Sequence, residues 1–105
     1  MTVKLTQTSM SDMRIIKENL DIFNESGTRF LDEITQKMEA LKTSPYLGTT
    51  LETKTEMATD YRFLVFRFTK RQIYIIIYKI DEKEEIVYIN RVFDGRMNYL
   101  SILFG

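Results

Sequence analysis

The chain contains no cysteine, no histidine and no tryptophan, and it has one proline among its 105 residues. Without cysteine, neither a disulfide framework nor a thiolate metal site can form, and a reducing compartment is expected. Without histidine, the chain lacks the most frequent general base and the commonest zinc ligand. We therefore expect no metal and no cofactor. Any catalysis would have to rely on lysine, arginine, tyrosine or carboxylate side chains.

An excess of one charge is also absent, because 15 Lys and Arg residues balance 15 Asp and Glu residues. A protein that holds a nucleic-acid backbone normally has a basic excess, since phosphate contacts supply most of that affinity. The chain up to Thr59 has seven basic and nine acidic residues, and the remainder has eight basic and six acidic residues. This asymmetry is too small to indicate direct, specific DNA binding.

Long hydrophobic runs are missing as well. The amino terminus lacks the apolar core of a signal peptide, and no apolar run reaches membrane-spanning length. We therefore expect a cytoplasmic protein that does not contact a membrane. A length of 105 residues, with 44% hydrophobic and 29% charged residues, fits a single globular domain over residues 1–105.

The first half of the chain predicts a short strand and two helices. Residues 2–6 alternate in polarity, which favours a strand. Ser9 or Ser11 can cap a first helix, Gly27 can end it in the left-handed conformation, and Thr28 can cap a second helix. The apolar stripes expected on these helices are Met13, Ile16, Leu20 and Phe23, then Leu31, Ile34, Met38 and Leu41. Helices joined by so short a turn form an αα-hairpin, with a coiled-coil dimerisation module as the alternative.

The second half of the chain changes to patterns typical of strands. Residues 46–59 have no periodicity and are interpreted as a loop. Residues 60–69, 72–80 and 86–93 are rich in Tyr, Phe, Ile and Val, and short polar clusters separate them, which predicts strands joined by hairpins. Residues 96–104 favour a last helical turn or a strand extension. The predicted fold class is α+β: an N-terminal β-strand, an αα-hairpin and a three-stranded antiparallel β-meander.

The middle predicted strand is apolar on both faces, whereas antiparallel sheets usually leave one face polar. The helical hairpin can cover only one face, so the carboxy-terminal tail or a second protein is expected to cover the other. A half-exposed sheet lined with tyrosine explains the same pattern without a partner. The candidate partner-binding residues are the aromatic residues of the strands and the apolar residues of the tail: Tyr74, Tyr78, Tyr88, Leu103 and Phe104.

Four segments resemble, in order, the toxins of the RelE/ParE superfamily of type II toxin–antitoxin systems. Residues 44–48 (SPYLG) are similar to the loop after the second helix of these toxins. Residues 60–65 (DYRFLV) and 76–80 (IIYKI) resemble the first two strands of their meander. Residues 90–99 (NRVFDGRMNY) resemble the closing signature, which typically runs Arg, two apolar residues, His or Tyr, Gly, Arg, Arg, Asp, Tyr. This likeness spans nearly the whole chain.

The closing segment departs from the signature at three positions: Asp94 replaces His or Tyr, Met97 replaces the second arginine, and Asn98 replaces the aspartate. Two of these positions belong to the cluster most often linked to toxicity. The candidate catalytic residues that the resemblance implies are Arg62, Arg91, Arg96 and Tyr99. An alternative to catalysis is that Arg91 bridges a carboxylate across the sheet and that Arg96 stacks with the tyrosine three residues later.

The resemblance implies a growth-inhibiting toxin, of the kind linked to plasmid stabilisation, in a hetero-oligomer with a cognate antitoxin. ParE-like toxins poison DNA gyrase by direct contact, whereas RelE-like toxins are metal-independent endoribonucleases that cut messenger RNA in the ribosome. The predicted middle strand has no basic residue before Lys79, and its isoleucines cannot stabilise a pentavalent phosphate. The pattern therefore favours action on gyrase. A ribosome-dependent nuclease and an inactive relative that only binds antitoxin remain alternatives.

Overall fold

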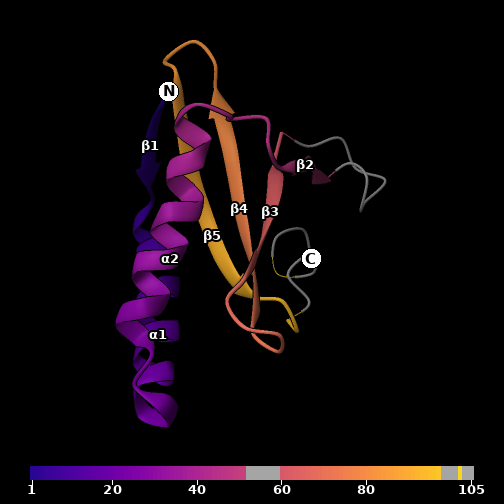
Figure 1. The fold of residues 1–105 in the computed structure, drawn as a ribbon. Coiled ribbons are helices and arrows are strands. Elements are labelled where there is room, and N and C mark those ends of the chain that lie inside the picture. Colours follow the sequence, from indigo (N-terminus) through magenta and orange to yellow (C-terminus); the bar gives the residue numbers. More distant parts are fainter. Residues whose placement is uncertain (52–59, 98–101, 103–105) are drawn as a thin grey trace.

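The computed structural model describes residues 1–51, 60–97 and 102. Two adjacent helices cover one face of a five-stranded sheet (Figure 1). The elements are β1 (Thr2–Leu5), α1 (Gln7–Asn24), α2 (Gly27–Glu39), the 3₁₀ helix η1 (Ala40–Lys42), β2 (Thr49–Thr50), β3 (Arg62–Arg67), β4 (Ile73–Asp81) and β5 (Ile86–Asp94). The predicted α+β class, with its first strand, αα-hairpin and meander, is confirmed.

The sheet is larger than the three predicted strands of the meander. Its strand order is β1-β5-β4-β3-β2, with β1 parallel to β5 and the other pairs antiparallel. The short strand β2 lies inside the segment that was interpreted as a loop. No helix in the described ranges combines the length and the apolar character needed to cross a bilayer.

Helix α1 begins earlier than the sequence suggested. Thr6 is the N-cap, and its hydroxyl oxygen accepts a hydrogen bond of 3.1 Å from the backbone N–H of Ser9. The predicted caps, Ser9 and Ser11, are therefore wrong. Ser9 is instead buried, and its hydroxyl donates back to the carbonyl oxygen of Thr6 at 2.9 Å. Because Thr6 directly follows β1, the helix begins almost where the strand ends.

The turn between the helices depends on a close contact. Glu25, with φ of 55°, takes the left-handed conformation that was predicted for Gly27, and Gly27 is the first residue of α2. The N–H of Gly27 donates to Asp21 Oδ1 at 2.9 Å, and a Cβ added to Gly27 would lie 2.4 Å from that oxygen. Ser26, and not Thr28, is the N-cap position of α2. Gly27 thus permits the close approach of the two helices.

The main core lies between the helices and the sheet. The buried positions Ile34, Met38 and Leu41 confirm most of the predicted second stripe, but this stripe starts at the fully buried Phe30 and not at Leu31. The ring of Phe30 packs against three aromatic rings of the sheet at centroid distances of 5.0 to 6.0 Å: Phe66, Phe68 and Tyr74. The first predicted stripe is wrong at Phe23, which is 84% exposed.

The opposite face of the sheet has its own small core. Ile75 and Ile77 are buried there together with Leu51, which directly follows β2, and with Phe93 of β5. A second protein is therefore not needed to cover the two isoleucines. The predicted role of the tail falls on residues outside the described ranges.

Candidate functional site

A β-bulge in β5 determines where the candidate arginines lie. The pairing of β4 with β5 shifts register between Ile77 and Tyr78, which leaves Asn90 as an extra, unpaired residue of β5. A bulge of this kind exchanges the faces on which the following side chains lie. As a result, Val92 is buried beneath the helices, whereas the guanidinium of Arg91 lies over the ring of Phe93, on the face away from the helices.

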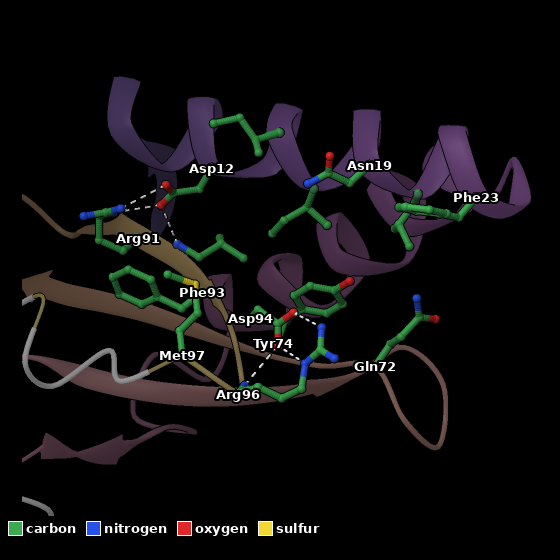
Figure 2. Close-up of a pocket in the computed structure, with 14 residues that line it drawn as sticks. Asp12, Asn19, Phe23, Gln72, Tyr74, Arg91, Phe93, Asp94, Arg96 and Met97 are labelled. Carbon is green, nitrogen blue, oxygen red and sulfur yellow. Dashed lines mark hydrogen bonds and ion pairs between the residues drawn. The ribbon is translucent and has the colours of Figure 1, made fainter.

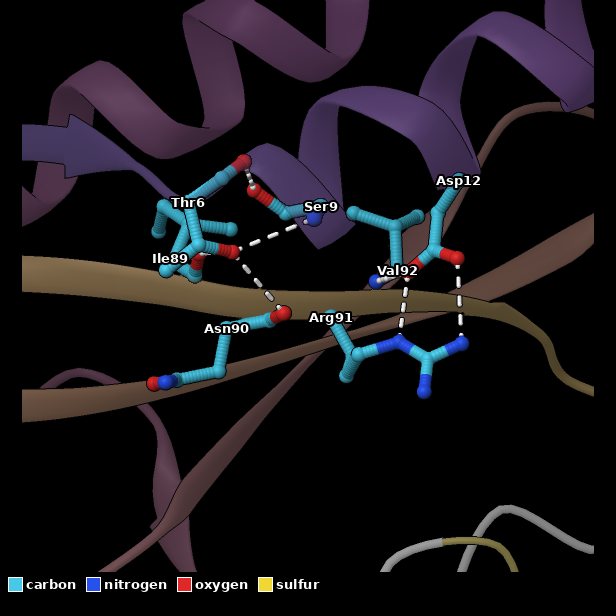
Figure 3. Close-up of polar contacts among 7 residues, drawn as sticks. All are labelled: Thr6, Ser9, Asp12, Ile89, Asn90, Arg91 and Val92. Carbon is cyan, nitrogen blue, oxygen red and sulfur yellow. Dashed lines mark hydrogen bonds and ion pairs between the residues drawn. The ribbon is translucent and has the colours of Figure 1, made fainter.

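Helix α1 binds the edge of β5 beyond the end of β1 (Figure 3). The carboxylate of Asp12 accepts hydrogen bonds from Arg91 Nε at 2.8 Å, from Arg91 Nη2 at 3.1 Å and from the backbone N–H of Val92 at 3.0 Å. The Asp12 hydrogen bond raises the pKa of Arg91 above its ordinary value. Arg91 is thus fixed by a carboxylate, but this carboxylate comes from a helix and not from across the sheet.

Arg62 lies in a different environment, next to the loop that follows η1. Its Nη1 donates to the carbonyl oxygen of Gly48 at 2.8 Å, and its guanidinium lies 5.0 Å from the ring centroid of Tyr46. The buried hydroxyl of Tyr78 accepts a hydrogen bond from the N–H of Gly48 and donates one to the carbonyl oxygen of Pro45, both at 2.8 Å. Arg62 therefore helps to hold this loop against the sheet.

Arg96 follows the end of β5 and is 86% exposed on its side chain. Its Nη2 lies 2.9 Å from Asp94 Oδ2, and its Nε also donates to the Asp94 carboxylate. The guanidinium holds the pKa of Asp94 below its ordinary value. Tyr99 lies outside the described residues, so its pairing with Arg96 stays a prediction.

A pocket of about 620 Å³ lies between α1 and the ends of β4 and β5 (Figure 2). Arg91 and Arg96 both line it, whereas Arg62 lines a second pocket of about 650 Å³ together with Lys79 and Tyr88. The structure therefore brings two of the candidate arginines together and separates the third. Further lining residues of the first pocket are the apolar Ile15, Leu20, Phe23 and Met97 and the polar Asn19, Gln72 and Tyr74.

Two of the predicted partner-binding tyrosines are inside the monomer. Two-residue alternation places Tyr74 and Tyr78 on the face of β4 beneath the helices, and they are 5% and 0% exposed. They therefore do not form the exposed partner surface that was expected, although Tyr74 lines the pocket. Tyr88 is half-buried, and Leu103 and Phe104 lie outside the described residues.

None of the hydrogen bonds among the described residues involves the hydroxyl of Tyr74. Burial is the main cause that raises the pKa of this tyrosine above 10.0. The phenol therefore stays protonated at neutral pH, and its hydroxyl can donate a hydrogen bond.

Sequence reasoning missed the residues that α1 contributes to the pocket. Asp12, Ile16, Asn19 and Phe23 follow each other at spacings of four, three and four, which places them along one line of a helix. The position of the N-cap could have revealed these residues, because a helix that begins at residue 7 places this line of side chains beside β5. Because this line mixes apolar and polar residues, its pattern does not indicate a core face or a site.

Two solved structures have the same fold as this chain. The chromosomal ParDE system from P. aeruginosa has a TM-score of 0.68 and 13% identity, with 90% of this chain and 95% of that chain covered. The intact RelBE toxin–antitoxin complex of E. coli has a TM-score of 0.59 and 14% identity, with 91% and 98% covered. No curated protein sequence matches the chain. The chain therefore shares the fold of these two structures.

The family of the chain follows from the sequence match. The family described as the ParE toxin of the type II toxin–antitoxin system, parDE, matches residues 3–99. The chain belongs to this ParE toxin family.

Proposed function

We propose that the protein is a growth-inhibiting toxin that acts by binding DNA gyrase, without chemistry of its own. The observation that supports this proposal is that the candidate arginines are already bound by oxygen atoms of the chain itself. Arg91 is bound by the carboxylate of Asp12, and Arg96 by the carboxylate of Asp94. Arg62 is hydrogen-bonded to a backbone carbonyl and does not line the pocket of the other two.

The physical reason concerns charge compensation. Cleavage of RNA by attack of the ribose 2′-hydroxyl builds negative charge on a crowded phosphorane, which uncompensated cations must stabilise. A guanidinium that already faces a carboxylate offers little net positive charge to such a transition state. Because the chain also has no histidine, a role in binding is favoured over a role in catalysis.

One observation favours a second function, that of a ribosome-dependent endoribonuclease. Arg91, Arg96 and the protonated hydroxyl of Tyr74 meet at one pocket. A phosphate entering there would compete with Asp12 and Asp94 for the two guanidiniums. An inactive relative that only binds antitoxin is a third reading, and it predicts normal growth on expression without the antitoxin.

We further propose a cytoplasmic cognate antitoxin that forms a hetero-oligomer with this chain. Two of the solved structures that share the fold are described as a ParDE toxin–antitoxin system and a RelBE toxin–antitoxin complex. The family match to a parDE toxin supports the same partner. A role in plasmid stabilisation is part of the proposal. The antitoxin is expected from the reading frame next to that of this chain.

The proposal is tested by inducing the chain alone in bacteria and following growth, plasmid topology and messenger RNA ends. We expect growth arrest together with loss of negative supercoiling in a reporter plasmid, and messenger RNA with unchanged ends in primer extension. New ends within codons and unchanged plasmid topology would favour the nuclease. Normal growth at high expression would leave only the inactive relative.

A further inference from the structure

The turn that follows β5 places Arg96 next to Asp94. In this turn, residues 94–97, the backbone N–H of Met97 donates to the carbonyl oxygen of Asp94 at 2.9 Å. The N–H of Gly95 donates to the carbonyl oxygen of Ile73 at 2.7 Å, and a Cβ added to Gly95 would lie 2.8 Å from that oxygen. The turn is thus held against the first residue of β4, and the backbone sets the position of Arg96.

The carboxylate of Asp94 accepts three hydrogen bonds from Arg96. Oδ1 accepts from the backbone N–H of Arg96 at 3.0 Å and from Nε at 3.2 Å, and Oδ2 accepts from Nη2 at 2.9 Å. Two donors of one guanidinium therefore face both oxygens of one carboxylate, which is the strongest geometry for such a pair. The charge of Arg96 is compensated within its own turn.

Asp12, which binds the neighbouring Arg91, differs from Asp94 because it also holds two elements together. Its carboxylate joins α1 to β5 through the guanidinium of Arg91 and the backbone N–H of Val92. Within the part of the chain that the structure describes, the side chain of Asp94 makes hydrogen bonds only to Arg96, two residues later. Loss of the Asp94 charge should therefore change the electrostatics at Arg96 and leave the fold intact.

Both members of the pair stay ionised near neutral pH. The hydrogen bond from Arg96 holds the pKa of Asp94 below its ordinary value. The same hydrogen bond raises the pKa of Arg96 above its ordinary value. The pair therefore has no net charge throughout the physiological range of pH.

The compensated guanidinium still has hydrogen-bond donors to offer. Its bonds to Asp94 use Nε and Nη2, so Nη1 lies outside them, and the side chain is 86% exposed. A neutral acceptor of a protein, such as a backbone carbonyl or an amide oxygen, can bind these donors without electrostatic repulsion. A phosphodiester would bring its negative charge close to the Asp94 carboxylate, which repels it.

We propose that Asp94 is a specificity-determining residue that prevents Arg96 from binding nucleic acid. The ligand class that it excludes is the phosphodiester backbone of single-stranded RNA. Asp94 stands where the closing signature of the RelE/ParE toxins has His or Tyr, and neither of these side chains is negatively charged at neutral pH. The inference rests on the proposed function, because it explains how this chain acts on a protein and leaves RNA unbound.

The test measures the affinity of the purified full chain for a fluorescently labelled single-stranded RNA by anisotropy. Asp94→Asn removes the negative charge but keeps an oxygen that can accept from the backbone N–H of Arg96. Asp94→Ser is a second neutral variant, whose hydroxyl can accept from the same N–H. The double variant D94N/R96Q removes the guanidinium as well. Thermal unfolding checks that each variant is folded.

Glu39→Gln is the matched control. It removes one negative charge from an exposed ion pair, that of Glu39 with Lys42, and so frees a different cation. Glu39 ends α2 near the start of β5, whereas Asp94 is the last residue of β5 (Figure 1). The control therefore separates a local effect at Arg96 from the change in net charge.

We expect Asp94→Asn and Asp94→Ser to bind the RNA about tenfold or more tightly than the native chain, and Glu39→Gln to stay within about threefold of it. The plot of log affinity against log salt concentration should also become steeper, by about 0.7 for one added phosphate contact. The affinity of D94N/R96Q should return to the native level, because the gain requires the guanidinium.

Equal affinities of the two Asp94 variants and Glu39→Gln would overturn the role of Asp94, and so would a gain that persists in D94N/R96Q. Tight binding of RNA by the native chain would overturn it as well, because Asp94 would then exclude nothing. None of these measurements involves gyrase. Inhibition of supercoiling by the native chain, measured separately, tests the proposed function on its own.

Discussion

Asp12 accepts hydrogen bonds from three donors of β5 and is the main polar link between α1 and the sheet edge. We predict that Asp12→Ala lowers the free energy of unfolding by about 2–3 kcal/mol, because it leaves the N–H of Val92 and the guanidinium of Arg91 without their acceptor. Urea unfolding measures this change. Glu33→Ala is the control, because its pair with Arg29 is largely exposed and is worth at most about 0.5 kcal/mol.

Equal destabilisation by the two variants would mean that the Asp12 cluster has no special structural role. In that case Arg91 would be free to turn toward other ligands of the pocket.

Tyr78 gives the protein a specific sensitivity to alkaline pH. Burial, as the main cause, raises its pKa above the ordinary value of 10.0 in the folded state. Because the folded state retains the proton longer, the stabilisation is complete below about pH 10 and is lost as the pH rises through the folded-state pKa. We predict that the unfolding free energy falls steeply above about pH 10 and less steeply in Tyr78→Phe. Urea titrations at several alkaline pH values test this, and identical slopes would contradict it.

Arg96 is the candidate residue whose role is easiest to separate from stability. Its side chain is 86% exposed and contacts Asp94 two residues earlier. We predict that Arg96→Ala weakens growth arrest while the thermal unfolding temperature stays within about 2 °C of the native value. Growth curves after induction, with expression checked by immunoblot, provide the measurement. Unchanged arrest would remove Arg96 from the functional surface.

At the scale of the elements, the sequence predicted the type of nearly every element but not their ends. Thr6, Ser9 and Ser11 can all cap a helix, and only the contact of Thr6 with β5 selects the first of them. The left-handed residue Glu25 is not a glycine, so composition did not reveal it. The short strand β2 has two residues, too few for any periodicity to show.

The sequence predicted Phe23 as a core residue of the first helix, whereas the structure buries Phe30 of the second helix, and stability measurements can distinguish the two arrangements. Phe30 is fully buried among three aromatic rings, so Phe30→Ala should cost about 3–5 kcal/mol. Phe23 is largely exposed, so Phe23→Ser should change the unfolding free energy by less than about 0.5 kcal/mol. Urea unfolding of both variants decides between the two arrangements. A large loss for Phe23→Ser would restore the stripe that the sequence suggested.

The candidate site was less predictable than the fold, because it depends on tertiary contacts. The bulge at Asn90 exchanges the faces of the sheet on which Arg91 and Val92 lie, and no local sequence pattern predicts this bulge. The partner of Arg91 is 79 residues away, on a helix whose orientation the sequence leaves open. The resemblance to the RelE/ParE toxins pointed correctly to the family, but the pocket itself includes helix residues that the signature does not contain.

At the scale of the whole molecule, the chain is a ParE-family toxin whose two sheet faces are largely covered from within. Some of its exposed apolar side chains, Ile15, Phe23 and Met97, line the pocket between α1 and the ends of β4 and β5, whereas others, such as Leu47 and Val65, lie elsewhere. This arrangement is consistent with the proposed action through contact with other proteins.

The most direct test of this account measures DNA supercoiling by purified gyrase in the presence of the purified protein. The account predicts inhibition that depends on protein concentration and is reversed by the product of the adjacent reading frame. It also predicts that messenger RNA on translating ribosomes stays intact in the same preparation. Full gyrase activity at concentrations that arrest growth, together with cleaved messenger RNA, would contradict the account.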